Sequence, residues 1–251
     1  MTKTLINLSF RSPPLKPKRA AAAVIEVVRL YGGNAPDFDV QDPFEVLVAT
    51  ILSQNTNVAN ARAALRNLKE GMPLTPSSLS EMPLSSLESR VRVSGLHRSK
   101  ARSIKAAAEH LLKNYGGGMR AMLSKDARAL RDELTSIRGI GLKTADIVLA
   151  FCAGVPTVPV DTHIARISTR LGLVRRGASY ESTRRALEDV IPADQRLAGH
   201  LGLINFGRTV CLARNPRCRV CPVRAMCAYY ARSKSHGEVR LRGAMRSAQR
   251  S

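Results

Sequence analysis

The stretch Leu134–Ala145, with the sequence LTSIRGIGLKTA, decides the fold. Helical patterns flank it, so it joins two helices through a turn in which Gly139 and Gly141 stand two residues apart. Glycine permits a positive φ and a close approach to the backbone. The N–H groups that begin the following helix can hold a phosphate. A G-x-G element alone also fits an ordinary turn between helices, but the whole string favours a phosphate-binding hairpin.

Outward from this hairpin, the chain has the pattern of a series of helices. Asp42, Pro43 and Glu45 predict a helix start with a cap, a proline at the first position and a capping box. Pro73 and Pro76 predict a loop. Alternating strand patterns are absent from the sequence, and aromatic residues make up only 4%. We therefore predict an all-α fold with helices over residues 20–31, 42–52, 58–68, 85–93, 99–115, 126–137, 143–151, 162–171 and 180–190.

The formal net charge is +21, which favours a polyanionic partner, and nucleic acid before an anionic lipid surface. Residues 1–20 and 208–251 together carry +15 of this charge, and we expect basic arms at 1–19 and 232–251 to contact phosphates. No stretch reaches the roughly 20 apolar residues of a membrane span. The start lacks the apolar segment of a secretory signal, whereas an organellar transit peptide stays open as an alternative to a disordered arm.

Lys143 and Asp161 are the candidate reactive residues. Lys143 follows the hairpin directly, and Asp161 precedes a predicted helix in the string Val-Asp-Thr-His. The spacing alone favours a simpler interpretation, in which Asp161 is a helix cap and Lys143 a phosphate contact, because aspartate is among the commonest caps.

Four of the five cysteines form a C-x6-C-x2-C-x5-C pattern at Cys211, Cys218, Cys221 and Cys227. Four thiolates in one short segment can enclose a single metal centre. Disulfides fit poorly because the rest of the chain is typical of an intracellular protein. Zinc stays possible, although zinc folds usually pair two C-x2-C elements and this chain has one. We expect Cys152, in an apolar stretch, to be a buried free thiol.

Together these residues resemble the endonuclease III family of DNA glycosylases, from about residue 22 to residue 230. The hairpin resembles the helix–hairpin–helix of that family, with Arg138 where the family usually has proline. The resemblance implies that Lys143 is the nucleophile and that Asp161 assists it. It also implies that the four cysteines hold a 4Fe–4S cluster, in keeping with ligation by four thiolates.

A glycosylase must flip its target base out of the duplex and fill the gap. By resemblance Gln54 is the candidate plug and Leu96 the intercalating side chain. Without the resemblance, Gln54 is a solvated loop residue and Leu96 fits equally well as a core leucine. Asn55 and Asn57 depart from the commonest bacterial form of the glutamine loop, which leaves the substrate preference open.

By resemblance we expect two domains: residues 43–153 with the hairpin, and residues 20–42 plus 154–231 with the cluster, with double-stranded DNA across the cleft between them. The expected protein is an intracellular, prokaryotic monomer. Its predicted activity is that of a bifunctional glycosylase, which removes oxidised pyrimidines and cleaves the abasic site by β-elimination. The alternatives are a mismatch glycosylase for T or U opposite G, and a non-catalytic iron–sulfur DNA-binding protein, against which the Lys–Asp pair argues.

Overall fold

The structure is a computed structural model, and it describes residues 17–33 and 37–233. Over these residues every regular element is helical and none is a strand, which confirms the all-α prediction. No helix in this part of the chain is long and apolar enough to cross a membrane. The predicted basic arms lie outside the described residues, apart from residues 17–19, which belong to the first helix, and residues 232–233.

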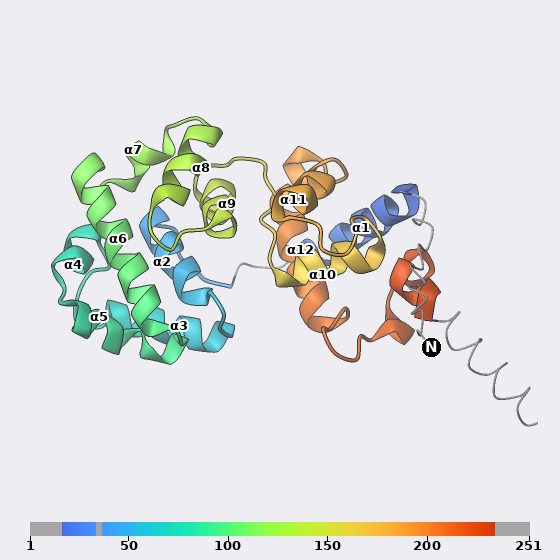
Figure 1. The fold of residues 1–251 in the computed structure, drawn as a ribbon, viewed down its shortest axis with the longest axis horizontal. Coiled ribbons are helices and arrows are strands. Elements are labelled where there is room, and N and C mark those ends of the chain that lie inside the picture. The colour runs from blue at the N-terminus through green and yellow to red at the C-terminus, as the bar shows by residue number, and fades with distance from the viewer. Residues whose placement is uncertain (1–16, 34–36, 234–251) are drawn as a thin grey trace, which may run out of the picture.

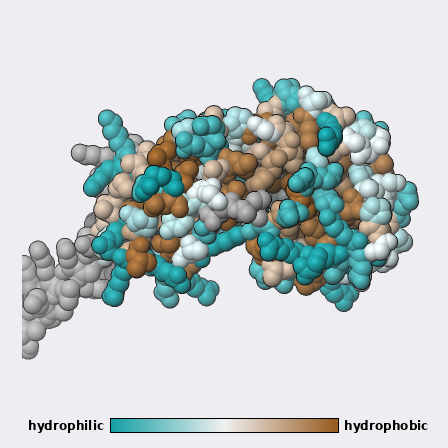
Figure 2. Space-filling model, turned by 180° about the vertical axis from the view of Figure 1, so that it is seen from behind, coloured by the Kyte–Doolittle hydropathy of each residue, from teal (hydrophilic) through white to brown (hydrophobic). Residues whose placement is uncertain are grey.

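The helices form two lobes (Figure 1). One lobe contains α2 (Pro43–Ser53), α3 (Val58–Lys69), α4 (Pro76–Glu81), α5 (Leu84–Arg90), η1 (Arg92–Ser94), α6 (His97–Tyr115), α7 (Met119–Leu123), α8 (Ala127–Ser136) and α9 (Leu142–Cys152). The other contains α1 (Pro17–Tyr31), α10 (Thr162–Leu171), α11 (Tyr180–Glu188), η2 (Ala193–Gln195), α12 (Arg196–Thr209), η3 (Cys218–Val220) and η4 (Arg224–Met226). Figure 2 shows the lobes joined at a narrower waist, with hydrophilic side chains over much of both.

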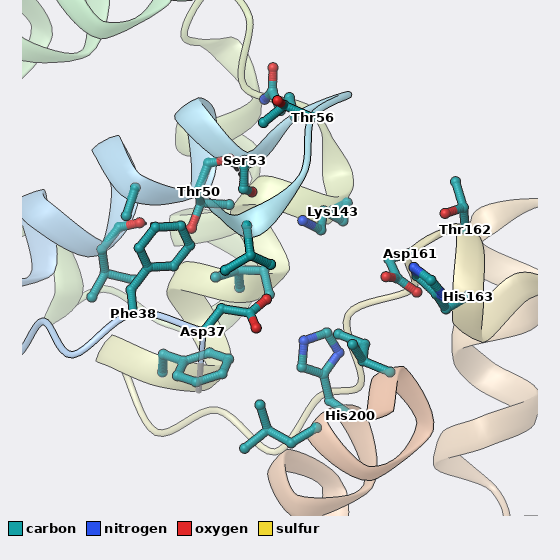
Figure 3. Close-up of a pocket in the computed structure, with 18 of the residues that line it drawn as sticks. Asp37, Phe38, Thr50, Ser53, Thr56, Lys143, Asp161, Thr162, His163 and His200 are labelled. Carbon is teal, nitrogen blue, oxygen red and sulfur yellow. Dashed lines mark hydrogen bonds between the residues drawn. The ribbon is translucent and has the colours of Figure 1, made fainter. Parts of the chain in front are cut away.

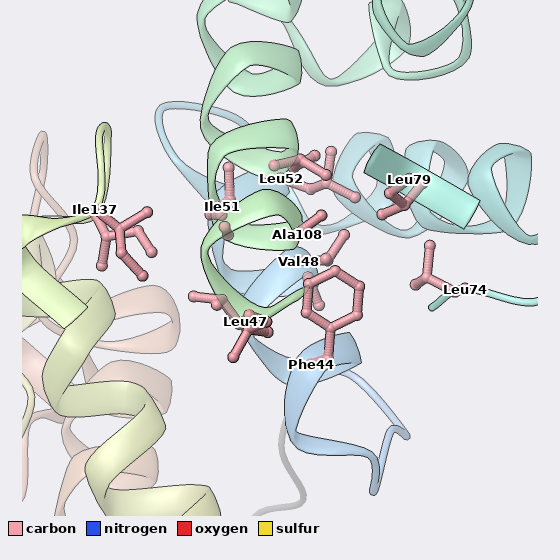
Figure 4. Close-up of a cluster of buried hydrophobic side chains, with 14 of the residues drawn as sticks. Phe44, Leu47, Val48, Ile51, Leu52, Leu74, Leu79, Ala108 and Ile137 are labelled. Carbon is pink, nitrogen blue, oxygen red and sulfur yellow. The ribbon is translucent and has the colours of Figure 1, made fainter. Parts of the chain in front are cut away.

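The core of the first lobe is built around α2, which is buried along most of its length. Phe44, Leu47 and Ile51 lie among leucines and alanines from the surrounding helices (Figure 4). Complete burial of one such side chain contributes about 1.5–3 kcal/mol. An aliphatic core of this kind suits a chain with few aromatic residues. It also packs α2 against α9, the helix that follows the hairpin.

The second lobe depends on close packing between α1 and α12. A Cβ on Gly202 would lie 2.9 Å from the backbone nitrogen of Gly32, so only glycine allows the two segments to approach this closely. The helix α12 was not predicted from the sequence, because Gly199 and Gly202 weaken its helical signal. It nevertheless carries five of the residues that line the cavity described below: His200, Leu201, Ile204, Asn205 and Arg208.

Several local predictions were wrong in detail. Residue Pro76 begins α4 instead of marking a loop, because Thr75 caps that helix and closes a capping box with Ser78. At α2, Asp42 accepts from the backbone N–H groups of Phe44 and Glu45 as predicted. The Glu45 side chain does not close a capping box there but pairs with Lys69 at 2.6 Å.

Candidate active site

A cavity of about 870 Å³ lies where the two lobes meet, and both lobes contribute to its walls (Figure 3). The first lobe supplies one side of α2, the loop after it, and Lys143, Ile147 and Phe151 along α9. The second supplies the start of α10 and one side of α12, and the connection between α1 and α2 closes the cavity with Asp37 and Phe38. Lys143 and Asp161, predicted from separate motifs, both line it.

Lys143 is the second residue of α9 and is partly buried in the cavity. Its Nζ donates no hydrogen bond to any described residue. Burial lowers the pKa of Lys143, the carboxylates of Asp161 and Asp37 oppose that shift, and Arg208 adds to it. The partial positive charge of a helix N-terminus also disfavours an ammonium at this place. The site therefore increases the share of neutral amine, the form that acts as a nucleophile.

Asp161 is the N-cap of α10, and its Oδ1 accepts a hydrogen bond from the Ile164 backbone N–H at 2.8 Å. The cap interpretation is therefore confirmed, and it does not compete with a place in the cavity. Among the described residues Oδ2 has no hydrogen-bond partner. The capping bond fixes the orientation of the carboxylate, and the helix N-terminus stabilises its negative charge. The Oδ2 oxygen therefore stays available to accept a proton.

The hairpin before α9 has the close approach that the glycines predicted. Gly139 has φ +82°, and a Cβ there would overlap the Ser103 side chain of α6. Gly141 instead has φ −96° and caps α9, so of the two glycines Gly139 is the one that adopts the positive φ that glycine permits. Arg138 is exposed at the tip of the turn.

The two candidate wedge residues lie in different surroundings. The Gln54 amide reaches the hairpin, and its Nε2 donates to Thr144 Oγ1 at 3.2 Å and weakly to the Gly139 carbonyl at 3.4 Å. Leu96 is 58% exposed and has a left-handed backbone, next to Val93, which is also exposed. The interpretation of Leu96 as a core leucine is therefore wrong, and its apolar side chain projects into solvent.

A buried lysine connects the loops that carry these two residues. The Lys100 side chain is only 2% exposed, and its Nζ donates to the carbonyl of Leu52 at 2.8 Å and to that of Ser94 at 2.7 Å. Leu52 lies two residues before Gln54, and Ser94 lies two residues before Leu96. Burial lowers the pKa of Lys100 to about 8. The Lys100 ammonium therefore holds the loop of Gln54 and the loop of Leu96 together through these two hydrogen bonds.

Sequence reasoning missed three polar residues of the cavity. Asp37 forms a bidentate ion pair with Arg208, whose Nη1 and Nη2 donate to Oδ1 at 2.7 Å and to Oδ2 at 2.9 Å. His200 is buried, its Nδ1 lies 2.8 Å from the Pro159 carbonyl, and burial lowers its pKa to about 4 despite the opposing effect of Asp161. A carbonyl only accepts, so Nδ1 carries the hydrogen of a neutral ring. These residues belong to distant segments, and no local pattern singled them out.

The four cysteines of the C-terminal pattern follow α12, and all are free thiols. Burial, with a smaller contribution from the nearby Cys227, Cys211 and Cys218, raises the pKa of Cys221 to about 11. Their side chains are not arranged as a ready metal site in the described part of the chain. Cys152 is partly buried, and burial raises its pKa to about 12, as expected of an unreactive thiol.

Two arginines of α10 hold the cysteine segment against that helix. Arg166 donates to the carbonyl of Cys211 at 2.9 Å, and Arg170 donates to the carbonyls of Leu212 at 2.6 Å and Ala213 at 2.9 Å. The helix that Asp161 caps is therefore bonded directly to the segment that carries the thiols.

Comparison with known proteins agrees with this arrangement. Residues 48–193 match the HhH-GPD superfamily of base excision DNA repair proteins. Endonuclease III of Thermotoga maritima is 35% identical over 217 residues, which cover 86% of this chain and 95% of that protein. The chain belongs to the endonuclease III family. It is accordingly a DNA glycosylase/AP lyase of base excision repair.

Solved structures support the same assignment. A trapped covalent intermediate of endonuclease III with DNA superposes with a TM-score of 0.79 at 31% identity, covering 88% of this chain and 99% of that one. A thermostable thymine-DNA glycosylase superposes with a TM-score of 0.73 at 21% identity, covering 86% of this chain and 98% of that one. The second likeness shows a shared fold and carries no information on substrate.

Proposed function

We propose that this enzyme removes oxidised pyrimidines of the thymine glycol type from double-stranded DNA and cleaves the resulting abasic site through a Schiff base at Lys143. The observation that carries the proposal is the presence of Lys143 and Asp161 in one cavity between the lobes. Its supports are the lowered pKa of Lys143 and the Asp161 oxygen that the helix cap leaves available.

The chemistry follows from these two groups. The neutral Lys143 amine attacks C1′ of the sugar, the glycosidic C–N bond breaks, and its electron pair leaves with the base. Asp161 accepts a proton from the attacking amine and stabilises the positive charge that develops on the sugar. The C1′–O4′ bond then opens, O4′ takes up the proton that Asp161 accepted, and the nitrogen, which keeps its remaining proton, becomes the protonated C1′ Schiff base. Removal of a C2′ proton then expels the 3′ phosphate, which breaks the strand.

The DNA contacts are assigned to the elements around the cavity mouth. The hairpin residues Arg138, Gly139 and Gly141 would hold a phosphate at the N-terminus of α9. Gln54 would fill the space of the flipped base, and the exposed Leu96 would enter the opposite strand. We propose that the protein acts as a monomer on DNA with a damaged base or an abasic site.

The thiols of Cys211, Cys218, Cys221 and Cys227 fit a 4Fe–4S cluster by their chemistry, because four free thiols within 17 residues of chain provide the four ligands of one cluster. When bound, the cluster would hold the segment that Arg166 and Arg170 attach to α10. Iron and sulfide analysis of the purified protein tests this. About four irons and four sulfides per chain are expected, whereas a single zinc ion would reject the cluster.

Borohydride trapping tests the lyase assignment. The wild-type enzyme should form a covalent adduct with duplexes that contain thymine glycol or an abasic site, and Lys143→Ala should form none. An equal yield from Lys143→Ala would reject Lys143 as the nucleophile. Comparing thymine glycol with G·T and G·U duplexes tests the substrate class, and faster reaction on the mismatches would favour a mismatch glycosylase.

A further inference from the structure

A buried carboxylate on α9 bridges the two lobes close to the cavity. Asp146 lies one helical turn after Lys143 and is 1% exposed. Its carboxylate accepts two hydrogen bonds from Arg131 of α8, at 2.6 and 2.8 Å, and one from the hydroxyl of Tyr180 at 2.7 Å. Arg131 belongs to the same lobe as Asp146, whereas Tyr180 begins α11 in the other lobe.

The Tyr180 hydroxyl also contacts the backbone next to Asp161. Its oxygen accepts a hydrogen bond from the Val160 backbone N–H at 3.3 Å, and Val160 directly precedes Asp161. A continuous chain of two hydrogen bonds therefore runs from Asp146, on the helix of the nucleophile, to the backbone that carries Asp161. Burial and the Asp146 anion raise the pKa of Tyr180, so the phenol keeps the proton that it donates.

Other side chains fix the same connecting segment to the second lobe. Arg196 donates to the Pro156 carbonyl at 2.6 Å, and the Nδ1–H of His200 donates to that of Pro159 at 2.8 Å. Glu188 accepts from the Thr157 hydroxyl at 2.7 Å and from the Val158 N–H at 3.2 Å. Of these side chains, Tyr180 bonds directly both to the connecting segment and to a side chain of the first lobe. A longer route runs from Glu188 through Arg184, whose Nε lies 3.9 Å from Asp146 Oδ2.

Charged groups around the bridge keep it rigid. Arg131 also pairs with Glu181 at 2.6 Å, and Arg184 pairs with Glu181 at 2.9 Å. Hydrogen bonds to ionised groups in a buried network are stronger and more directional than exposed ones. The Tyr180 hydroxyl therefore links the Asp146 carboxylate of the first lobe to the Val160 backbone of the second.

From this geometry we propose that Asp146 and Tyr180 form an interlobe latch that sets the position of Asp161 relative to Lys143, with Tyr180 as a positioning residue for the glycosylase and lyase steps. The inference rests on the proposed roles of Lys143 and Asp161. Reacting groups that are misplaced by about 1 Å lose as much as a hundredfold in rate. Loss of the latch therefore slows chemistry without removing any group that touches DNA.

The test removes a single oxygen atom. Tyr180→Phe keeps the ring and deletes both hydrogen bonds, and we expect single-turnover borohydride trapping to slow about tenfold. The Kd for a duplex with a reduced abasic-site analogue should stay within about twofold of wild type. Tyr115→Phe is the matched control, because Tyr115 donates to the partly buried Glu133 carboxylate at 2.7 Å within one lobe. This control should trap at the wild-type rate.

A double-mutant cycle separates positioning from general loosening. If Tyr180 acts through Asp161, Tyr180→Phe should slow the wild type but produce little further loss in Asp161→Asn. Additive losses, a wild-type trapping rate in Tyr180→Phe or an equal loss in Tyr115→Phe would each overturn the latch. The proposed function fails separately, if Lys143→Ala still traps DNA.

Discussion

Two buried lysines in the first lobe have opposite surroundings. Lys100, beneath the wedge loops, donates from its ammonium to two carbonyls, and one of them lies in the last turn of α2. Lys143, in the cavity, has no such partner among the described residues and lies in the first turn of α9. The negative end of a helix stabilises an ammonium, and the positive end disfavours it.

The difference teaches that burial alone does not make a lysine reactive. Desolvation lowers the pKa of both residues. The Lys100 nitrogen is occupied by structural bonds, whereas that of Lys143 faces an open cavity that it shares with Asp161. A nucleophile therefore requires desolvation together with unused bonding capacity, and three changes probe that distinction.

The largest effect on activity is expected for Lys143→Met. Loss of the nucleophile should reduce borohydride trapping by about 10³-fold or more. The free energy of unfolding should stay equal or rise slightly, because a desolvated cation is removed. Urea unfolding beside trapping measures both quantities, and a clear loss of stability would mean that Lys143 has a structural role like that of Lys100.

Asp161→Asn should slow trapping by about a hundredfold, because proton acceptance and charge stabilisation are lost while the amide can still cap α10. The Asp161 carboxylate raises the pKa of Lys143, so its neutralisation should lower that pKa. Trapping depends on the neutral amine, so the acidic limb of the pH–rate profile should move to lower pH. A shift to higher pH would contradict the proposed pairing; Asp37, Arg208 and His200 are the other titratable groups that influence this cavity.

Lys100→Met should have the smallest effect on chemistry and the largest on folding. Two buried carbonyls lose their donor, at about 1–3 kcal/mol each, which urea unfolding should detect. Trapping should fall only a few-fold, with weaker binding to lesion DNA because both wedge loops are loosened. Lys105→Met is the matched control: Lys105 donates to the carbonyls of Ser80 and Met82, away from those loops. If both variants bind DNA equally well, the Lys100 link between the two loops has no role in recognition.

The sequence predicted the parts of the site that have local signals. The hairpin, the helix start at Asp161 and the cysteine spacing each occupy a short continuous segment, and the all-α fold followed from helical periodicity. The residue roles and the domain boundaries stay predictions. Lys100 and Tyr180 carried no such signal, because a lysine in a helix resembles a solvated residue until its neighbours are known. The partners of Tyr180, Asp146 and Val160, come from other segments of the chain.

The contact between Gly139 and Ser103 has a consequence for design. The hairpin lies so close to α6 that the two positions share the volume of one small side chain, and the positive φ of Gly139 adds a second restriction. Positions 103 and 139 should therefore be varied as one unit. A larger residue at either would push the hairpin, and with it the amide groups offered to the phosphate, away from the rest of the lobe.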